Sequence, residues 1–313
     1  MIAQFKNVSK TYKGKIPVKA LNGLSYEVRE GEILGLLGPN GSGKTTSLNC
    51  LLSLLEFDSG EILLFDQEMK PHRYDLKKKI GLVPQNPAVF SELTVQENID
   101  FFCNLYIKDK KIRAQYVKEA IEFVALEGYE KFMPKKLSGG LLRRLNIACG
   151  IAHKPELIIF DEPTVAVDPQ TRNLIIDNIL KLNQQGSTII YTSHYMEEIE
   201  VLCDYIVIMD KGIVIADGTK DKLKEMINLG ETIHVELDEI SDDVLNQLKK
   251  LKDISQVSFK RDQLMIKTNK GKTLLSQVLD CLIKYNVSYK KIYSELPTLN
   301  DVFLELTGKE LRE

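Results

Sequence analysis

The chain of 313 residues carries 42 lysine and arginine residues and 44 aspartate and glutamate residues, which gives a net charge of −2. This near-neutral balance gives no support to functions that need a strongly basic surface, such as nucleic-acid binding. Hydrophobic residues make up 43% and charged residues 27%, as in ordinary globular proteins, and the length favours two domains.

The five scattered cysteines form no C-x-x-C pair and predict reduced thiols in a cytosolic protein. No apolar run approaches the roughly 18–20 residues that cross a bilayer, and the first residues lack the apolar core of a signal peptide. We therefore expect a chain without a membrane span, so that any membrane role comes through a partner.

Residues 1–35 predict an antiparallel sheet, because apolar side chains alternate along residues 2–5 and 24–28 between glycine-containing turns. Tyr12 lies in the polar turn at residues 9–14, where a buried tyrosine would be unexpected. An exposed ring at this position can stack on an adenine base. The alternative is a surface tyrosine that caps the sheet.

The stretch at residues 38–46 is the most informative in the chain. It fits the pattern G-x-x-x-x-G-K-[ST], follows an apolar strand pattern at residues 32–37 and precedes a helical pattern at residues 47–55. In such a strand–turn–helix unit, backbone N–H groups cradle the β- and γ-phosphates of a nucleoside triphosphate. Lys44 adds a positive charge toward these phosphates, and the Thr45 hydroxyl is the expected ligand of Mg²⁺.

Two further strand patterns follow at residues 60–65 and 80–84, and Gln85 comes directly after the second. Ligands gather at the carboxyl ends of parallel strands. This glutamine can therefore offer its carbonyl oxygen to Mg²⁺ or to an attacking water, although alone it is a weak indication.

Residues 93–145 show a helical pattern that starts with a capping box at residues 94–97. An aromatic-rich stripe runs along its first part and consists of Phe101, Phe102, Leu105 and Tyr106. We expect this stripe to belong to the core. The alternative is that part of it borders a groove for a partner's helix.

Ser138, Gly139 and Gly140 precede an amphipathic pattern, so the free N–H groups of a helix N-terminus would form a second anion site. The pattern alone also fits a plain loop-to-helix cap. Asp161 and Glu162 close an apolar run and predict two carboxylates at the end of a buried parallel strand. One carboxylate can hold Mg²⁺, and the other can accept a proton from water.

A turn at residues 165–169, which contains Asp168, leads into the next helical pattern at residues 172–182. Another core strand pattern, at residues 186–194, ends in His194, one of only four histidines in the chain. A lone histidine is more often structural, but this one belongs to the strand end nearest the carboxylates. Residues 206–209 and 213–216 predict a closing hairpin.

The pattern changes near residue 223, after a charged connection at residues 220–224. Strand and helix patterns then follow in the order β-α-β-β-α-β, which is typical of a ferredoxin-like motif, at residues 233–237, 242–251, 257–259, 264–268, 274–282 and 288–292. A last helix is predicted over residues 300–306. This segment has no catalytic constellation and indicates a regulatory or assembly role.

Taken together, these motifs resemble those of the ATP-binding subunit of an ABC transporter over residues 1–220. The run Leu137-Ser138-Gly139-Gly140 carries the resemblance most specifically. It implies an α/β fold: an ABC-type P-loop ATPase domain with a RecA-like core, an antiparallel β subdomain and a helical subdomain at about residues 88–145. A small α+β ferredoxin-like domain at residues 223–313 would follow, with a regulatory or dimerisation role.

The resemblance implies a role for each matching residue. Glu162 would be the general base, His194 the switch histidine on the γ-phosphate and Gln85 the Q-loop glutamine. Asp161 would be the Walker B aspartate and would share Mg²⁺ with Thr45 and Gln85. The residues expected to bind ATP are Tyr12, Gly38, Asn40, Gly41, Ser42, Gly43, Lys44, Thr45, Thr46, Ser138, Gly139, Gly140 and Asp168.

Such domains act as head-to-tail dimers. Ser138–Gly140 of one subunit would close over the ATP held by the other subunit, which implies a homodimer or a homologous heterodimer. Leu141 departs from the glutamine, methionine or glutamate that is more common after Ser-Gly-Gly, and residues 165–168 lack the small glycine variants common in the D-loop. We expect activity to survive the first departure, whereas the second bears on dimer coupling.

Residues 296–308 look like the tail of bacterial drug and antibiotic exporter ATPases of the daunorubicin-resistance, sodium-efflux and linearmycin-resistance types. Residues 161–172 and 191–197 are also similar to that branch. The resemblance implies an ATPase that powers export of drugs, antibiotics or other small amphipathic compounds. It would pair with separately encoded permease subunits at the cytoplasmic face of the cell membrane, with no nucleic-acid partner.

Two alternatives belong to other classes of function. One is a soluble ABC ATPase that acts on DNA or ribosomes, but the chain lacks a long coiled-coil insertion and a second ATPase domain. The other is a regulatory or immunity protein with low turnover. The presence of Glu162 and His194 argues against it.

Overall fold

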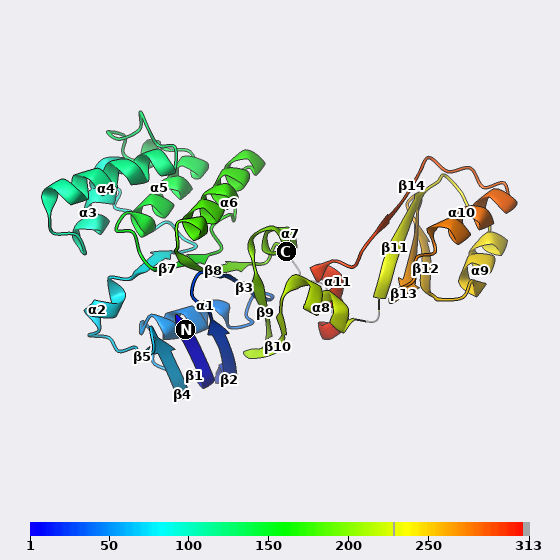
Figure 1. The fold of residues 1–313 in the computed structure, drawn as a ribbon, viewed down its shortest axis with the longest axis horizontal. Helices are drawn as coiled ribbons and strands as arrows, with labels where there is room; N and C mark the ends of the chain where they lie inside the picture. Colours follow the sequence, from blue (N-terminus) through cyan, green and yellow to red (C-terminus); the bar gives the residue numbers. More distant parts are fainter. Residues whose placement is uncertain (228, 309–313) are drawn as a thin grey trace. The chain divides into compact units, whose positions relative to one another are not determined.

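The computed structural model describes residues 1–227 and 229–308. The chain folds as two compact units, one formed mainly by Met1–Thr219 and a second that begins at Lys220 (Figure 1). Across the described residues, no helix is both long and apolar enough to cross a bilayer.

A six-stranded sheet forms the centre of the first unit, with strand order β10-β9-β3-β8-β7-β6. The strands are β3 (Ile33–Leu37), β6 (Ile80–Val83), β7 (Leu157–Asp161), β8 (Thr188–Ser193), β9 (Tyr205–Asp210) and β10 (Ile213–Gly218). All neighbours pair in parallel except β9 and β10, which form the predicted antiparallel hairpin. Every residue of β3, β7 and β8 is buried, as expected for parallel strands covered on both faces.

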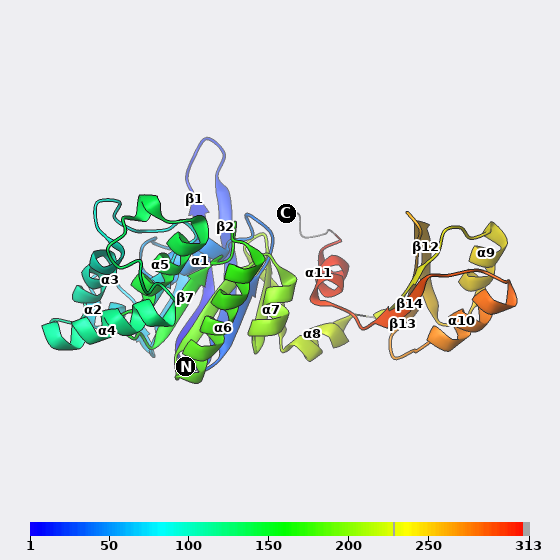
Figure 2. The same ribbon diagram turned by 90° about the horizontal axis from the view of Figure 1, so that it is seen from above.

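A second, antiparallel sheet contains the strands predicted near the N-terminus. It has the order β2-β1-β4-β5 and consists of β1 (Ala3–Tyr12), β2 (Val18–Val28), β4 (Ser59–Leu64) and β5 (Gln67–Glu68). Helix α1 (Lys44–Leu51) packs between the two sheets, because Leu48 and Leu51 share one apolar cluster with Phe5 of β1 and Leu34 of β3. On the other face of the parallel sheet lie α6 (Pro169–Gln184) and α7 (Met196–Leu202) (Figure 1 and Figure 2).

The helical region predicted at residues 93–145 is divided into α3 (Val95–Asn104), α4 (Lys110–Phe123), the 3₁₀ turn η1 (Pro134–Lys136) and α5 (Gly139–Ile151). A short helix that was not predicted, α2 (Tyr74–Lys77), precedes β6. The capping box at the start of α3 is confirmed, since Thr94 and Glu97 bond each other's backbone N–H groups. The expectation that the aromatic stripe of α3 belongs to the core was wrong. Phe101 is 40% exposed and Leu105 is 51% exposed. The rings of Phe90, Phe101 and Phe102 pack on one another at the surface.

The second unit has the predicted ferredoxin-like arrangement, an antiparallel sheet of order β12-β13-β11-β14 with two helices on one face. Its elements are α8 (Lys220–Met226), β11 (Leu229–Glu236), α9 (Asp242–Lys250), β12 (Ile254–Lys260), β13 (Gln263–Asn269), α10 (Leu275–Lys284), β14 (Lys291–Glu295) and α11 (Leu299–Thr307). Ile233, Ile266, Leu248 and Leu282 form part of its core.

Two predictions for the second unit need correction. The charged connection expected at residues 220–224 is the helix α8, which buries Leu223. The last strand was expected at residues 288–292 but lies at Lys291–Glu295, where it pairs with β11. Pairing with a neighbouring strand, which local patterns do not reveal, determines where this strand begins.

Candidate active site

The loop at residues 38–46 joins β3 to the first turn of α1. Gly41 and Gly43 have φ angles of 82° and 106°, a left-handed backbone that glycine adopts without strain. A Cβ atom on Gly43 would also lie only 2.6 Å from the Ala20 carbonyl oxygen. The helix N-terminus that follows presents free N–H groups to an anion. The local geometry is therefore that of a phosphate-binding loop.

Lys44 is buried and folds back over this loop. Its Nζ atom donates to the carbonyl oxygens of Gly38 at 2.6 Å and Pro39 at 3.3 Å. Burial lowers the pKa of Lys44, while the carboxylates of Glu162 and Asp161 act in the opposite direction. The ammonium group is thus held where the loop would bring phosphate oxygens.

Oxygen atoms suited to a magnesium ion meet beside this loop. The Thr45 hydroxyl donates to one carboxylate oxygen of Asp161 at 3.3 Å, and the Thr192 hydroxyl donates to the other at 2.7 Å. A hydroxyl and a carboxylate oxygen this close together fit the donor set that Mg²⁺ prefers. The residues present therefore fit Mg²⁺.

Glu162 is the point at which the predicted catalytic side chains meet. Gln85 donates its amide N–H to the Glu162 carboxylate at 2.9 Å, and His194 Nδ1 lies 3.5 Å from the same oxygen. Lys44 Nζ is 3.9 Å from the other carboxylate oxygen. Within the described residues, buried Nδ1 of His194 has no hydrogen-bond partner. Glu162 itself has a φ of 49°, a strained conformation that its backbone N–H supports by bonding Thr192.

Tyr12 ends β1 and is 42% exposed, as expected from its polar surroundings. Its hydroxyl lies 3.3 Å from the Thr46 hydroxyl, so the ring is beside the phosphate loop. Ring stacking on adenine stays a prediction.

Ser138 and Asp168 lie at the starts of two other helices. Ser138 caps α5 by accepting from Leu141 N–H at 3.3 Å, and Asp168 caps α6 by accepting from Thr171 N–H at 2.9 Å. A Cβ atom on Gly140 would lie 2.8 Å from the Thr171 hydroxyl, so the two helix starts are in contact. Ser138, Gly140 and Asp168 thus form a second group of predicted site residues, apart from the residues that contact Glu162.

Comparisons with known proteins identify the family. A sequence profile described as "ABC transporter" matches residues 21–165. The linearmycin resistance ATP-binding protein of Bacillus subtilis (strain 168) is 36% identical, and the match covers 99% of both chains. The chain belongs to the ABC transporter family. The Nod factor export ATP-binding protein I of Burkholderia orbicola is 33% identical over 99% of this chain and 98% of its own.

Solved structures agree with this assignment of an ABC ATPase. An ATP-binding cassette determined as a dimer, in a post-hydrolysis state with ADP and Pi, has a TM-score of 0.65 and 29% identity. The match covers 70% of this chain and 98% of that cassette. The chain is therefore an ATP-binding protein and an ATPase, and its P-loop ABC fold is the one expected from the sequence.

Two polar residues of this ABC ATPase site were missed from the sequence. Thr192 bonds both Asp161 and the backbone of Glu162. Arg143, inside α5, is buried and donates to the Gln85 carbonyl oxygen at 2.6 Å. The only signals were a threonine near the end of an apolar strand and an arginine in an amphipathic helix, and neither pattern specifies a contact.

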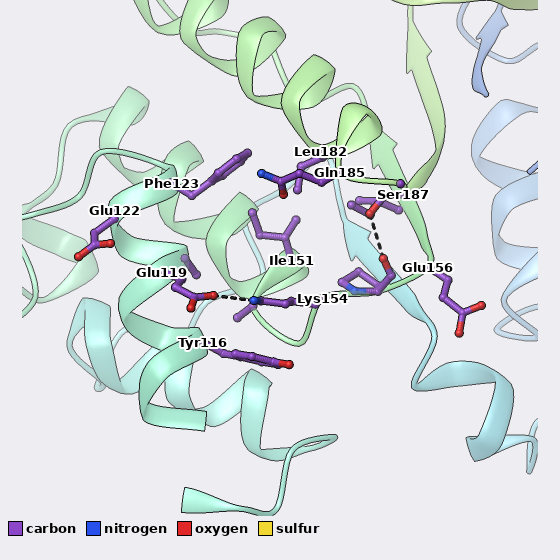
Figure 3. A pocket seen from close by; sticks show the side chains of 15 residues that line it. Tyr116, Glu119, Glu122, Phe123, Ile151, Lys154, Glu156, Leu182, Gln185 and Ser187 are labelled. Atoms are coloured by element: carbon purple, nitrogen blue, oxygen red, sulfur yellow. Dashed lines mark hydrogen bonds and ion pairs between the residues drawn. The ribbon is translucent and has the colours of Figure 1, made fainter. Parts of the chain in front are cut away.

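A cavity of about 800 Å³ lies at the opposite end of the parallel strands from this site. Glu156 and Ser187, which precede β7 and β8, line it, whereas Asp161 and Ser193 end these strands. Inside it, Lys154 pairs with Glu119 beside the ring of Tyr116 (Figure 3). Size alone does not locate the chemistry, because the phosphate loop and both carboxylates lie at the carboxyl ends of the strands.

Proposed function

We propose that this ATPase powers export of drugs, antibiotics or other small amphipathic compounds through separately encoded permease subunits at the cytoplasmic face of the cell membrane. The observation that carries the catalytic part is the meeting of Gln85, Lys44 and His194 around the Glu162 carboxylate. The export part is supported by full-length similarity to proteins named for linearmycin resistance and Nod factor export.

In the proposed hydrolysis, each of these side chains has a separate role. The loop N–H groups and Lys44 hold the β- and γ-phosphates, and His194 contacts the γ-phosphate with its ring. Glu162 accepts a proton from the water that attacks the γ-phosphorus, and Gln85 orients that water through its bond to Glu162. The bond from the γ-phosphorus to the bridging oxygen of ADP breaks, so that ADP and phosphate are the products. Mg²⁺, held by Thr45, Asp161 and Gln85, would neutralise negative charge on the phosphate oxygens.

We further propose a head-to-tail dimer with ATP between the subunits. Within the same chain, Ser138 accepts a hydrogen bond from Leu141 of its own helix α5, and Gly140 lies against Thr171 at the start of α6. The N-terminus of α5 is thus available to the ATP bound by a second copy. A related cassette was solved as a dimer, which supports this arrangement.

An apolar groove beside α3 supports a contact with the permease. A groove of about 280 Å³ is lined by apolar residues that include Leu54, Leu82, Phe102 and Leu105. We propose that its occupant is a short apolar helix of the permease. Pro84 also lines this groove and directly precedes Gln85, so a bound helix would act next to a residue that bonds Glu162.

The second unit, from Lys220 onward, is proposed to act in dimer contact or gating. Its apolar cluster contains residues from this unit alone, and the predicted ATP-binding residues all belong to the first unit. A role outside catalysis therefore fits it best.

A transport experiment tests the proposed function. Cells that lack the gene are complemented with the wild-type chain or with Glu162→Gln, and accumulation of a panel of amphipathic antibiotics is measured. We expect lower accumulation of at least one compound with the wild-type chain only. Equal accumulation of every compound in the two strains, although the wild-type chain hydrolyses ATP in vitro, would overturn the export assignment.

A further inference from the structure

A buried carboxylate, that of Glu198, lies outside the group of side chains around Glu162 and binds several residues next to that group. Glu198, in α7, is only 3% exposed. One of its oxygens accepts three hydrogen bonds: from the Tyr191 hydroxyl at 2.7 Å, the Ser193 hydroxyl at 2.8 Å and the Thr164 hydroxyl at 2.9 Å. A buried charge is costly unless it is paired and hydrogen-bonded, so these three hydroxyl donors stabilise the Glu198 carboxylate.

The second Glu198 oxygen faces Arg172 of α6, whose Nε atom lies 3.5 Å away. Among the described residues, these two atoms lack an aligned hydrogen bond, so the contact is an ion pair alone. Burial, and then the Glu198 charge, raise the pKa of Tyr191 well above its usual value. Its phenol therefore stays protonated and remains a donor to Glu198.

The partners of Glu198 are neighbours in sequence of the catalytic residues. Ser193 precedes His194, and its hydroxyl also accepts from the Tyr195 N–H at 2.9 Å. Thr164 lies two positions after Glu162, in a segment where Glu162 adopts a left-handed backbone. One carboxylate thus ties the segment that carries the base to the segment that carries the switch histidine.

Arg172 extends this connection to the helix that starts at Asp168. Its guanidinium group lies 4.7 Å from the centre of the Tyr195 ring, which in turn lies 4.2 Å from the His194 ring. The Arg172 side chain is 32% exposed, whereas that of Glu198 is 3% exposed. The ion pair therefore joins the start of α6 to the His194 segment.

We propose that Glu198 is a positioning residue that holds Glu162 and His194 in their reactive arrangement, with Arg172 as its counter-charge. This inference rests on the proposed roles of Glu162 and His194. It predicts a change in turnover rather than in ATP affinity, because Glu198 contacts the segments that carry the proposed reacting side chains, whereas most of the predicted ATP-binding residues belong to the phosphate loop.

The main test is Glu198→Gln in the full chain, with Glu197→Gln as its matched control. Glu197 is an exposed carboxylate one position earlier in the same helix. We expect kcat to fall at least about tenfold, because a misplacement of about 1 Å can cost about 100-fold in rate. The Kd for a non-hydrolysable ATP analogue with Mg²⁺ should stay within about twofold of the wild-type value, and the control should match wild type in both.

Arg172→Gln supplies a second variant if Glu198→Gln folds poorly. It leaves the Glu198 charge without its ion-pair partner, so we expect a lower kcat. If Glu198→Gln folds, the loss in the double variant should be smaller than the product of the two single losses, because both residues act through the same ion pair. A purely structural pair would lower Tm without lowering kcat per folded molecule. The imidazole NMR signals of His194, assigned with His194→Ala, should shift in Glu198→Gln and not in Glu197→Gln.

Glu162→Gln and His194→Ala, measured alongside, distinguish a failure of the proposed catalytic roles from a failure of the positioning role. If they hydrolyse ATP at the wild-type rate, the proposed catalytic roles fail. If both are inactive while Glu198→Gln keeps wild-type kcat and unshifted His194 signals, only the positioning role is overturned.

Discussion

The side-chain amide of Gln85 donates a 2.9 Å hydrogen bond to the carboxylate of Glu162, although 77 positions separate them in the chain. The two residues follow β6 and β7, which are parallel neighbours, so both side chains emerge at one edge of the sheet. This bond links the proposed general base to the groove beside Pro84, where we place the permease helix. A structural change in that groove could therefore reach the Glu162 carboxylate through Gln85 alone.

Replacing Glu162 with glutamine should retain ATP binding and remove the proton acceptor. General-base catalysis contributes about 10²–10⁴-fold, so we expect kcat to fall by at least about 100-fold. ATP would then persist in the closed site, and size-exclusion chromatography with ATP and Mg²⁺ should show a stable dimer. Hydrolysis at the wild-type rate would show that Glu162 is not the base.

Lys44→Ala should abolish measurable ATP binding, because it removes a buried ammonium group from the phosphate loop. Losing such a contact costs at least about 2 kcal/mol, or roughly 30-fold in Kd. Isothermal titration with ATP measures this loss. Lys118→Ala, which removes an exposed lysine on α4, is the control and should bind normally. Undiminished affinity in Lys44→Ala would contradict the phosphate-loop assignment.

Leu105→Asp should weaken the association with the permease, because it places a charge on the apolar groove. Leu105 is 51% exposed, so the chain should still fold and bind ATP. Co-purification with the membrane subunit should fall, whereas Ile112→Asp, on the exposed side of α4, should co-purify like the wild type. Equal recovery of the permease with both variants would remove the groove from the proposed interface.

His153 should make the stability of the first unit depend on pH. It is 7% exposed, and burial lowers its pKa below the ordinary 6.5, although its contact with the Ile80 carbonyl partly opposes this. Because the unfolded chain binds the proton more readily, the free energy of unfolding should decrease as the pH falls through 6.5 toward the folded-state pKa. The slope for one proton reaches about 1.4 kcal/mol per pH unit.

Urea unfolding at about pH 7.5 and about pH 5.5 measures this effect. His153→Gln should lose less stability between the two conditions than the wild type. His72→Gln, a change at an exposed histidine, should behave like the wild type. Identical pH dependence in all three proteins would show that His153 is not responsible.

A chain that ends at Thr219 should still bind ATP, because every predicted ATP-binding residue precedes this position. If the second unit contributes to dimer contact, the Kd of the ATP-bound dimer should rise at least about fivefold, equivalent to about 1 kcal/mol. Analytical ultracentrifugation of Glu162→Gln, with and without the truncation, measures this. Unchanged dimerisation together with unchanged transport would argue against a role in either process.

Several elements could be predicted because their causes are local. The glycines at residues 38–46 are required by left-handed backbone at Gly41 and Gly43, and the capping box at Thr94 involves residues three positions apart. The order of elements in the second unit also followed from periodicity, although the start of β14 did not. Local predictions failed where burial depended on distant segments, as with the exposed stripe at Phe101 and Leu105.

The sequence by itself determined the phosphate loop, the carboxylates that end an apolar strand and the resemblance to an ABC ATPase, because each depends on neighbouring residues. Only the tertiary structure decided which side chains meet. Parallel pairing of β6, β7 and β8 brings Gln85 and His194 to Glu162 and places Thr192 against Asp161. It also buries Glu198 beneath donors from two other segments. Such contacts join residues far apart in the chain, and packing of the sheet and its helices creates them.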